Sequence, residues 1–267
     1  MFELIEPICL VNFFSDEPND ALTALGLRDN YWDGYFAGRA APLGRVPAEV
    51  VHAAFYNFAP GETARHIPLV WEMTTPEAAI EARTKGCAAA LTRILRDLID
   101  SPTLLVAADL ATKAAMSAPT EGRVMYAALR RLTVPEDPVE RLWHAANLLR
   151  EHRGDGHIAA LMANRIGGTE AHVLVALDLG MPAEKFGRVS HLPAAQLSAV
   201  VDGMRSRGLV TPEGTFTDAG RETKSRIEHL TDELAVAPYL GLTTRELGLL
   251  VTALEPIAAA LNATGSR

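Results

Sequence analysis

The chain has 267 residues, with 33 acidic and 25 basic side chains and a formal charge of −8 at neutral pH. This length suits one large domain or two small ones. Hydrophobic residues make up 48% of the chain and charged residues 22%, so the composition excludes a disordered or fibrous protein. The negative charge provides no general attraction for nucleic acid, so DNA binding would need a local basic patch.

The cysteines and the first residues bear on cellular location. Cys9 and Cys87 are too few and too far apart for a disulfide framework or a cysteine metal site, which favours a reducing cytoplasm. The first seven residues contain Glu3 and Glu6 and no basic side chain, unlike a secretory signal. Charged residues interrupt the apolar runs, and none looks long enough to cross a bilayer. We therefore expect a soluble cytoplasmic protein with no membrane partner.

Apolar residues recur at steps of three and four along most of the chain, which predicts amphipathic helices and a mainly α fold. In the first half, this spacing predicts an alanine-rich helix from Thr75 to Ile94. In the second half, a helix that starts at Val139 is predicted to end at Arg153-Gly154, because glycine can take the left-handed conformation that closes helices. The carboxylate of Asp155 would then cap the next helix.

The most specific pattern follows in the second half. A short helical turn from Pro182 to Arg188 precedes a predicted helix from Pro193 to Ser206. The segments 209–211 and 215–217 are predicted to be short strands around a Pro-Glu-Gly turn, and Asp218 is predicted to cap a further helix. A short helix, a turn, a second helix and a β-hairpin form the arrangement of a winged helix-turn-helix.

The residues after this second helix resemble a known family. In residues 204–221, the Arg-Gly-Leu-Val turn and the segment Gly-Thr-Phe-Thr-Asp-Ala-Gly-Arg resemble the recognition helix and wing of MarR-type regulators. More broadly, residues 55–58, Trp143-His144 and residues 149–157 resemble an actinobacterial family of helix-turn-helix-like proteins to which no settled chemistry is attached. The resemblance implies a fold and leaves the activity open.

The two halves of the chain share a pattern of helix-ending residues. Asp33-Gly34 and Asp155-Gly156 are each followed, at matching distances, by a Pro-x-Glu sequence. We predict tandem winged helix-turn-helix-like repeats, a degenerate one in residues 1–136 and a MarR-like one with a small β-hairpin wing in residues 137–267. Because MarR-type regulators are homodimers, such a chain would form a monomeric pseudo-dimer or a homodimer. The alternative is a chance alignment of two alanine-rich segments.

A recognition helix reads DNA through long polar side chains on its free face, flanked by phosphate contacts. The free face of the helix predicted over residues 193–206 carries mostly small residues and Asp202, so DNA binding is a hypothesis rather than a deduction. An alternative is a protein that binds or sequesters a small molecule and no longer binds DNA. The candidate DNA-binding residues are Lys185, Arg188, Gln196, Ser198, Arg205 and Arg207.

Aromatic and histidine side chains suggest a second kind of site. If the repeats pack about a pseudo-two-fold axis, the turns near residues 31–36 and 153–157 would approach each other and enclose a small, aromatic ligand. The leading hypothesis is therefore a ligand-responsive MarR-like regulator. The plain alternative is that these aromatic residues anchor the core. The candidate ligand-binding residues are Trp32, Tyr35, Tyr56, His66, Trp71, Trp143, His144, His152, Arg153, Asp155 and His157.

Signatures of common enzymes are missing from the sequence, including a glycine-rich phosphate loop, a Gly-x-Ser-x-Gly elbow and a His-Glu-x-x-His motif. A metal- or acid–base-dependent enzyme that uses His152, Asp155 and His157 stays open as a further alternative. The plain alternative is that Asp155 caps a helix and that both histidines are structural. We predict no catalytic residue, no cofactor and no metal ligand.

Overall fold

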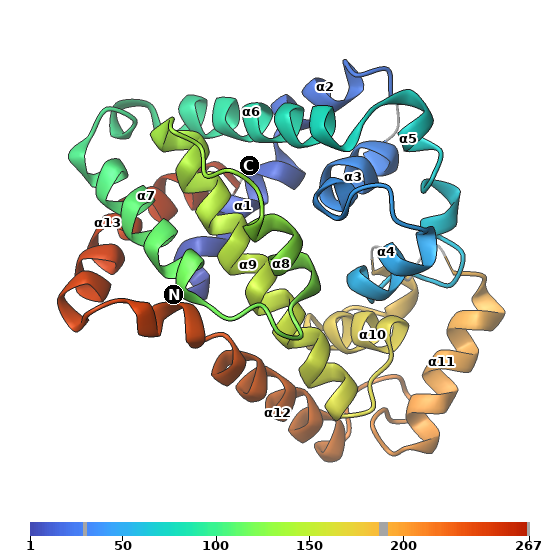
Figure 1. The fold of residues 1–267 in the computed structure, drawn as a ribbon. Coiled ribbons are helices and arrows are strands. Elements are labelled where there is room, and N and C mark those ends of the chain that lie inside the picture. Colours follow the sequence, from blue (N-terminus) through green and yellow to red (C-terminus); the bar gives the residue numbers. More distant parts are fainter. Residues whose placement is uncertain (29–30, 187–191, 266–267) are drawn as a thin grey trace. The chain divides into compact units, whose positions relative to one another are not determined.

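The computed structural model describes residues 1–28, 31–186 and 192–265. These residues fold almost entirely into helices (Figure 1), which confirms the prediction of a mainly α chain. Within those three ranges there is no β-strand, and Val210 and Phe216 form an isolated antiparallel bridge. The predicted β-hairpin wing is therefore wrong.

The chain divides into two compact units. The first unit consists of Met1–Pro47, His66–Asp155 and Ala235–Arg267, and the second consists of Ala48–Arg65 and Gly156–Leu234. Each unit is assembled from segments that are far apart in the sequence. This division does not test the duplication, so the repeats in residues 1–136 and 137–267 stay a prediction.

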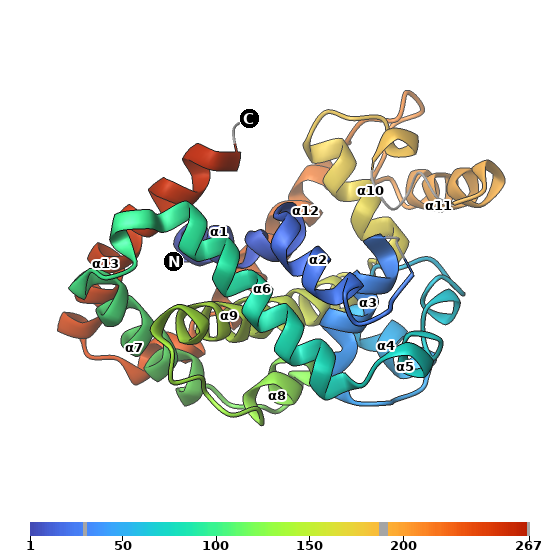
Figure 2. The same cartoon turned by 90° about the horizontal axis from the view of Figure 1, so that it is seen from above.

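The first unit is built around helices α1, α6, α7 and α13, which pack against one another and against the early turns of α9 (Figure 2). Alanine residues make up most of the buried face of α7, and Ala79, Gly86 and Ala90 lie on the buried face of α6, so the helix backbones can approach closely. The helices of this unit are α1 (Phe2–Phe14), α2 (Asp16–Thr23), α3 (Tyr31–Ala40), η1 (Ala41–Leu43), α5 (Val70–Met73), α6 (Pro76–Leu95), η3 (Arg96–Leu98), α7 (Pro102–Ser117), α8 (Val124–Arg130), α9 (Pro138–Ala163) as far as Asp155, η6 (Ala237–Gly241) and α13 (Thr244–Gly265).

Helix α6 confirms the helix predicted from Thr75 to Ile94. The Thr75 hydroxyl oxygen accepts a hydrogen bond from the Ala78 amide at 3.2 Å, which caps the first turn. Gly86 lies where α2 crosses α6, and a Cβ atom at this position would stand 2.5 Å from the Pro18 Cα atom. The absence of a side chain at Gly86 therefore allows the close contact between these two helices.

Helix α9 corrects the predicted break at Arg153-Gly154. The helix continues from Pro138 to Ala163, and Gly154 does not take a positive φ. Glycine in a helix interior costs about 1 kcal/mol relative to alanine, but the neighbouring Glu151 and Asp155 are buried and held by other parts of the first unit. Tertiary contacts therefore override the local signal for a helix end.

Helix α13 is long and apolar enough, by length and composition alone, to cross a membrane. Residues 244–264 contain a window with a mean hydropathy of 1.5, so the expectation that no run reaches this length is wrong. A core helix of a soluble protein passes the same test. Leu250, Leu254 and Ile257 of α13 are buried in the core of the first unit, so these properties do not by themselves establish a membrane span.

The second unit has its own hydrophobic core, which includes Leu161, Val173, Leu197, Met204 and Ile227. Tyr56 supports this core, because its hydroxyl group donates a hydrogen bond to the Ile166 carbonyl oxygen. The helices of this unit are α4 (Ala48–Phe55), η2 (Thr63–Arg65), the last turns of α9, α10 (Gly168–Asp178), η4 (Ala183–Lys185), α11 (Ala194–Ser206) and α12 (Asp218–Leu234).

Helices α10 and α11 lie on either side of the predicted helical turn. Helix α10 begins at Gly168, after its cap Gly167, and the Glu170 carboxylate accepts a hydrogen bond from the Gly167 amide at 2.8 Å. Helix α11 confirms the helix predicted from Pro193 to Ser206. Between them, η4 covers three residues of the predicted turn, and Arg188 lies outside the described residues.

The segment predicted as a wing is a tight loop. Its backbone pairing is limited to the Thr211 amide with the Thr215 carbonyl (2.8 Å) and the Thr217 amide with the Leu209 carbonyl (3.2 Å), around the single bridge. The Thr217 hydroxyl oxygen accepts a hydrogen bond from the Gly220 amide at 2.9 Å, which caps α12 at once. The cap is therefore Thr217 and not Asp218, and the chain enters a helix before a strand can extend.

Gly220, in the first turn of α12, lies where this helix approaches the loop most closely. A Cβ atom here would lie 2.1 Å from the Leu209 carbonyl oxygen, so the backbone would have to move. We expect Gly220→Ala to lower the free energy of unfolding by about 1–3 kcal/mol, because overpacking outweighs the gain in helix propensity. Denaturant titration measures this change. Gly203→Ala on α11 is the matched control, since its Cβ would meet no atom within 4 Å, and an equal loss in both variants would contradict the explanation.

Candidate functional site

Helices α10 and α11 of the second unit form the predicted pair of helices, and they are in contact. Leu197 and Met204 bury one side of α11 in the core of the second unit. The opposite side carries Ala195, Gln196 and Asp202, all of which are exposed. This side of α11 is therefore a free surface within the second unit, composed mainly of small and polar side chains.

The predicted DNA-binding cations are mostly engaged in contacts within the second unit. Arg205 pairs with Asp202 at 2.8 Å and donates to the Thr211 and Pro212 carbonyl oxygens. Arg207 pairs with Glu170 and donates to a backbone carbonyl oxygen. These arginines hold the loop and the start of α10, so they are less available for DNA phosphates than their charges suggest.

The remaining predicted DNA-binding residues lie on the surface. Lys185 is exposed at the end of η4 and makes no ion pair with the described residues. Gln196 is exposed on α11, with no hydrogen bond from its side chain within the described parts of the chain. Ser198 is exposed one step further along, with its hydroxyl group 3.5 Å from an Asp202 carboxylate oxygen. Gln196 is therefore the long polar side chain that this face offers.

The predicted ligand-binding residues belong to both units. Tyr56 and His157 belong to the second unit, and the other nine belong to the first. His157 lies 2.9 Å from the Thr231 hydroxyl group, which links α9 to α12 within the second unit. The cavity predicted from the sequence therefore stays a prediction.

Trp71 and Trp143 are core residues of the first unit. Both side chains are buried, and neither indole N–H has a hydrogen-bond acceptor in the described residues. The Arg83 guanidinium lies 5.0 Å from the centre of the Trp143 ring, at cation–π distance. These placements favour the plain alternative for both tryptophans, in which they anchor the core.

His66 takes part in a buried contact with Asp33. Its Nδ1 atom lies 2.6 Å from an Asp33 carboxylate oxygen, and its ring stacks on Phe36 at 4.7 Å. Arg28 binds the same carboxylate with two nitrogens. Asp33 therefore joins the segment before α3 to the segment after η2, and His66 contributes to this junction.

Asp155 caps a helix other than the predicted one. Its carboxylate oxygens accept hydrogen bonds from the Tyr126 amide at 2.9 Å and the Met125 amide at 3.3 Å, at the start of α8. Burial raises the pKa of Asp155 to about 6, although both amides act in the opposite direction. Asp155 is therefore a structural cap for α8, formed by a residue of α9.

His144 and His152 are buried side chains of α9. Among the described residues, His144 Nε2 and both ring nitrogens of His152 have no hydrogen-bond partner. Burial lowers the pKa of His144 to about 4. Burial, together with the charge of Arg123, lowers the pKa of His152 to about 4. Both imidazoles are therefore neutral near pH 7, and the His152 ring meets Tyr126 edge-on at 5.0 Å.

Arg153 stacks on an aromatic ring instead of completing a histidine site. Its guanidinium carbon lies 4.1 Å from the centre of the Phe2 ring, at cation–π distance. Among the described residues, no group of three or more His, Cys, Asp or Glu side chains is placed to hold a metal ion. The enzyme alternative that uses His152, Asp155 and His157 remains an untested prediction.

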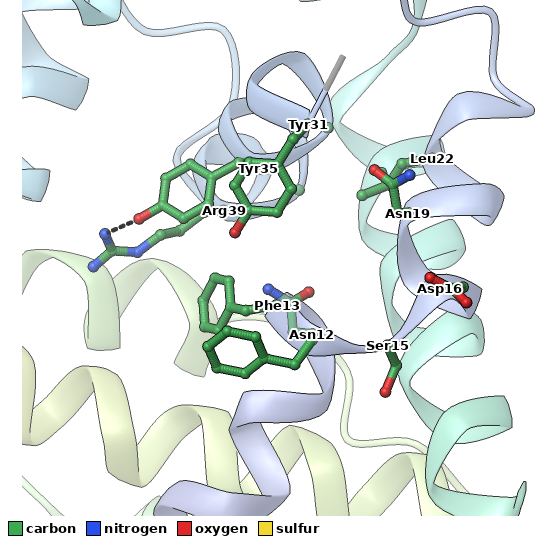
Figure 3. Close-up of a pocket in the computed structure, with 12 residues that line it drawn as sticks. Asn12, Phe13, Ser15, Asp16, Asn19, Leu22, Tyr31, Tyr35 and Arg39 are labelled. Atoms are coloured by element: carbon green, nitrogen blue, oxygen red, sulfur yellow. Dashed lines mark hydrogen bonds between the residues drawn. The ribbon is translucent and has the colours of Figure 1, made fainter. Parts of the chain in front are cut away.

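The structure shows a pocket that sequence reasoning missed. It has a volume of about 210 Å³ in the first unit, between the end of α1, the start of α2 and one face of α3 (Figure 3). Of the predicted ligand residues, Tyr35 lines it, and Trp32 lies beside Tyr35 at 5.5 Å between ring centres. The lining residues of this α1–α3 pocket are Asn12, Phe13, Phe14, Ser15, Asp16, Asn19, Leu22, Tyr31, Gly34, Tyr35, Gly38 and Arg39.

A sequence signal for this pocket existed. Tyr31, Tyr35 and Arg39 follow one another at steps of four, so a helix places all three on one face. Figure 3 shows the two tyrosine rings side by side and the Arg39 guanidinium directed to the Tyr35 hydroxyl group, at 3.0 Å. Attention to that spacing would have identified α3 as one wall of a polar, aromatic site.

A buried ion network lies beside the pocket. Glu151 is buried, and its carboxylate accepts hydrogen bonds from Arg39 at 3.1 and 3.3 Å and from Arg150 at 3.4 Å. Arg150 also binds Glu6 at 2.9 Å. Burial alone would raise the pKa of Glu151, but the charges of Arg39 and Arg150 hold it below its usual range. Glu151 is therefore charged and fixes α3 to α9.

Removal of the Glu151 charge should destabilise the first unit. Glu151→Gln keeps the shape of the side chain but leaves two partly buried guanidinium groups without their shared carboxylate, so we expect a loss of about 3 kcal/mol in unfolding free energy. Denaturant titration provides the measurement. Glu81→Gln breaks an exposed pair with Lys85 and should cost less than about 1 kcal/mol. Similar losses for both variants would refute the role of the network.

The lowered pKa of His152 predicts acid sensitivity. In the unfolded chain the imidazole has a pKa near 6.5, whereas in the folded protein its pKa is about 4. The contribution of His152 to the free energy of unfolding is therefore lost as the pH falls from 6.5 to 4. The raised pKa of Asp155 acts in the opposite direction between pH 4 and 6. We expect His152→Leu to reduce the loss of stability between pH 7.5 and 5 by about 2 kcal/mol. His229→Leu, at an exposed position, should not; an unchanged slope in His152→Leu would refute the assignment.

Comparison with known proteins adds a family. A family described as "Helix-turn-helix family" matches residues 1–266. No curated protein and no solved structure matches the chain. The match specifies neither a MarR-type subfamily nor an actinobacterial source, so those parts of the resemblance stay predictions. At a coarse level, the family suggests a DNA-binding regulator, and the chain belongs to this helix-turn-helix family.

Proposed function

We propose that the chain is a DNA-binding regulator that uses α10 and α11 as its helix-turn-helix and inserts α11 into the major groove. The exposed side of α11, opposite Leu197 and Met204, supports this proposal most directly. A recognition helix needs one face anchored in a core and the other face free for base edges. Small residues such as Ala195 and Ala199 would allow this helix to approach the bases closely.

In this proposal, base contacts come mainly from one residue. Gln196 can donate to and accept from adenine in the major groove, and its side chain is exposed. Lys185 supplies a cation at the end of η4 that can contact a phosphate group. Arg205 and Arg207 are engaged in ion pairs within the second unit, so we expect few contacts to DNA phosphates. Because each phosphate contact adds to the salt dependence of binding, the affinity for DNA should fall only moderately as the salt concentration rises.

We also propose that the protein responds to a small molecule and works in the cytoplasm. The α1–α3 pocket, which combines an aromatic wall with polar side chains such as Asn12 and Asn19, supports ligand binding. The cytoplasmic location is supported by Cys9 and Cys87, which are buried free thiols. From the resemblance of residues 204–221, we propose that the regulator is of the MarR type. The predicted β-hairpin wing is not part of this proposal. A protein that binds only the small molecule remains the second candidate function.

The DNA-binding proposal predicts opposite effects for two neighbouring residues on α11. Asp202→Asn removes a negative charge from the free face and releases Arg205, so we expect DNA affinity to rise about two- to fivefold at low salt. Gln196→Ala should reduce the preference for a specific duplex over a random one, with little change in nonspecific binding. Fluorescence anisotropy with a labelled duplex from the gene's own upstream region measures both effects.

The control for this experiment is Glu81→Gln, which changes one charge on an exposed pair of the first unit. It should bind DNA as the unmodified protein does. Absence of any complex at micromolar protein in low salt would overturn the proposal. A general gain of affinity in both Asp202→Asn and Glu81→Gln would show that net charge acts rather than α11.

A further inference from the structure

The α1–α3 pocket has a wall of aromatic rings. The centre of the Tyr35 ring lies 5.8 Å from that of Phe13 and 6.1 Å from that of Tyr31, so three rings surround one side of a 210 Å³ space. Such ring distances are typical of aromatic contacts, and a further planar ring inserted here would meet faces and edges at similar distances. The volume suits a single ring with few substituents.

The other walls offer hydrogen-bonding groups that the protein does not use. The Asn12 carboxamide oxygen accepts from Arg83 at 2.8 Å, which fixes its NH2 group as a donor with no acceptor in the described residues. The Asn19 side chain, on α2, makes no hydrogen bond to any described residue. In Figure 3, Asn12, Asn19 and Tyr31 stand around the same space from three different helices. A ligand with polar substituents would satisfy the Asn12 and Asn19 side chains.

The charges beneath the pocket do not balance. Arg39, Arg83 and Arg150 lie close to the carboxylates of Glu6 and Glu151, which leaves one guanidinium charge without a carboxylate. That cation is Arg83, which is buried and whose hydrogen bonds go to the neutral oxygens of Asn12 and Gly38. A buried charge without a carboxylate of its own is costly, and an anion nearby would reduce the cost.

We propose that the α1–α3 pocket binds a small aromatic carboxylate, with its ring between Phe13, Tyr31 and Tyr35 and its negative charge toward Asn12 and Arg39. The positive charge of Arg83 lies directly behind Asn12 and stabilises the bound anion through that amide. The exposed Asp16 carboxylate, at the outer side of the lining, accepts a hydrogen bond from a ligand hydroxyl group. The pocket lies outside residues 204–221, so the proposal extends the ligand-binding part of the proposed function and does not depend on DNA binding.

The test is a binding titration of the whole chain with 4-hydroxybenzoate, by calorimetry and by tryptophan fluorescence from Trp32 beside Tyr35. We expect saturable binding, and binding of 4-hydroxybenzamide that is at least about tenfold weaker because it lacks the charge. Cyclohexanecarboxylate should also bind more weakly because it lacks the aromatic ring. Equal binding of the amide overturns the anion assignment, and equal binding of the cyclohexane acid overturns the role of the rings.

Two glycine variants locate the site. The Cβ of Gly34→Ala would lie 3.6 Å from the Asn19 Oδ1 atom, an ordinary contact inside the pocket, so the variant should fold at least as well as the original and bind at least about tenfold more weakly. Gly248→Ala on α13 gives the same gain in helix propensity, with no atom within 4 Å of its Cβ, and should bind normally. Unchanged binding in Gly34→Ala, or no saturable binding by the unmodified chain, overturns the proposal. Because no DNA is present, neither result affects the DNA-binding proposal.

Discussion

The buried carboxylate of Glu151 is the interaction on which the interior of the first unit depends. It lies on α9 and holds Arg39 of α3 and Arg150 of its own helix. Removing a carboxylate from water in this position costs free energy. Its attraction to Arg39 and Arg150 offsets that cost only in one arrangement of α3 and α9. The position of α3 in turn sets the Tyr31, Tyr35 and Arg39 face, so the pocket wall is fixed from behind by this ion network.

Local signals were reliable where a helix carries its own start and its own apolar stripe. Helix α6, with its Thr75 cap, and α11, with its repeating apolar residues, were both predicted from the sequence. The predictions failed where a distant partner decides. The Asp155 carboxylate binds amides of α8, about thirty residues earlier in the chain, so α9 continues where the local sequence suggests an end. The wing failed because Thr217 caps a helix before a strand can form.

The candidate sites show the same contrast. The type and spacing of residues indicated a helix pair and an aromatic, ligand-binding region, but not which charges are already neutralised. Arg205 and Arg207 were predicted as DNA contacts from their positions in the sequence, yet each binds a carboxylate nearby. Trp71 and Trp143 were predicted to line a cavity, and both are buried in the core. Side-chain partners of this kind depend on tertiary structure, which composition and periodicity do not encode directly.

The discontinuous composition of the two units has a consequence for the order in which the chain folds during synthesis. Helix α1 packs on α13, so the core of the first unit lacks one of its central helices until residues 244–265 have left the ribosome. The second unit needs only residues 48–65 and 156–234 and is complete earlier. Helix α1 precedes the second unit in the chain but is buried after it, so the apolar face of α1 must be protected while that later part of the chain folds.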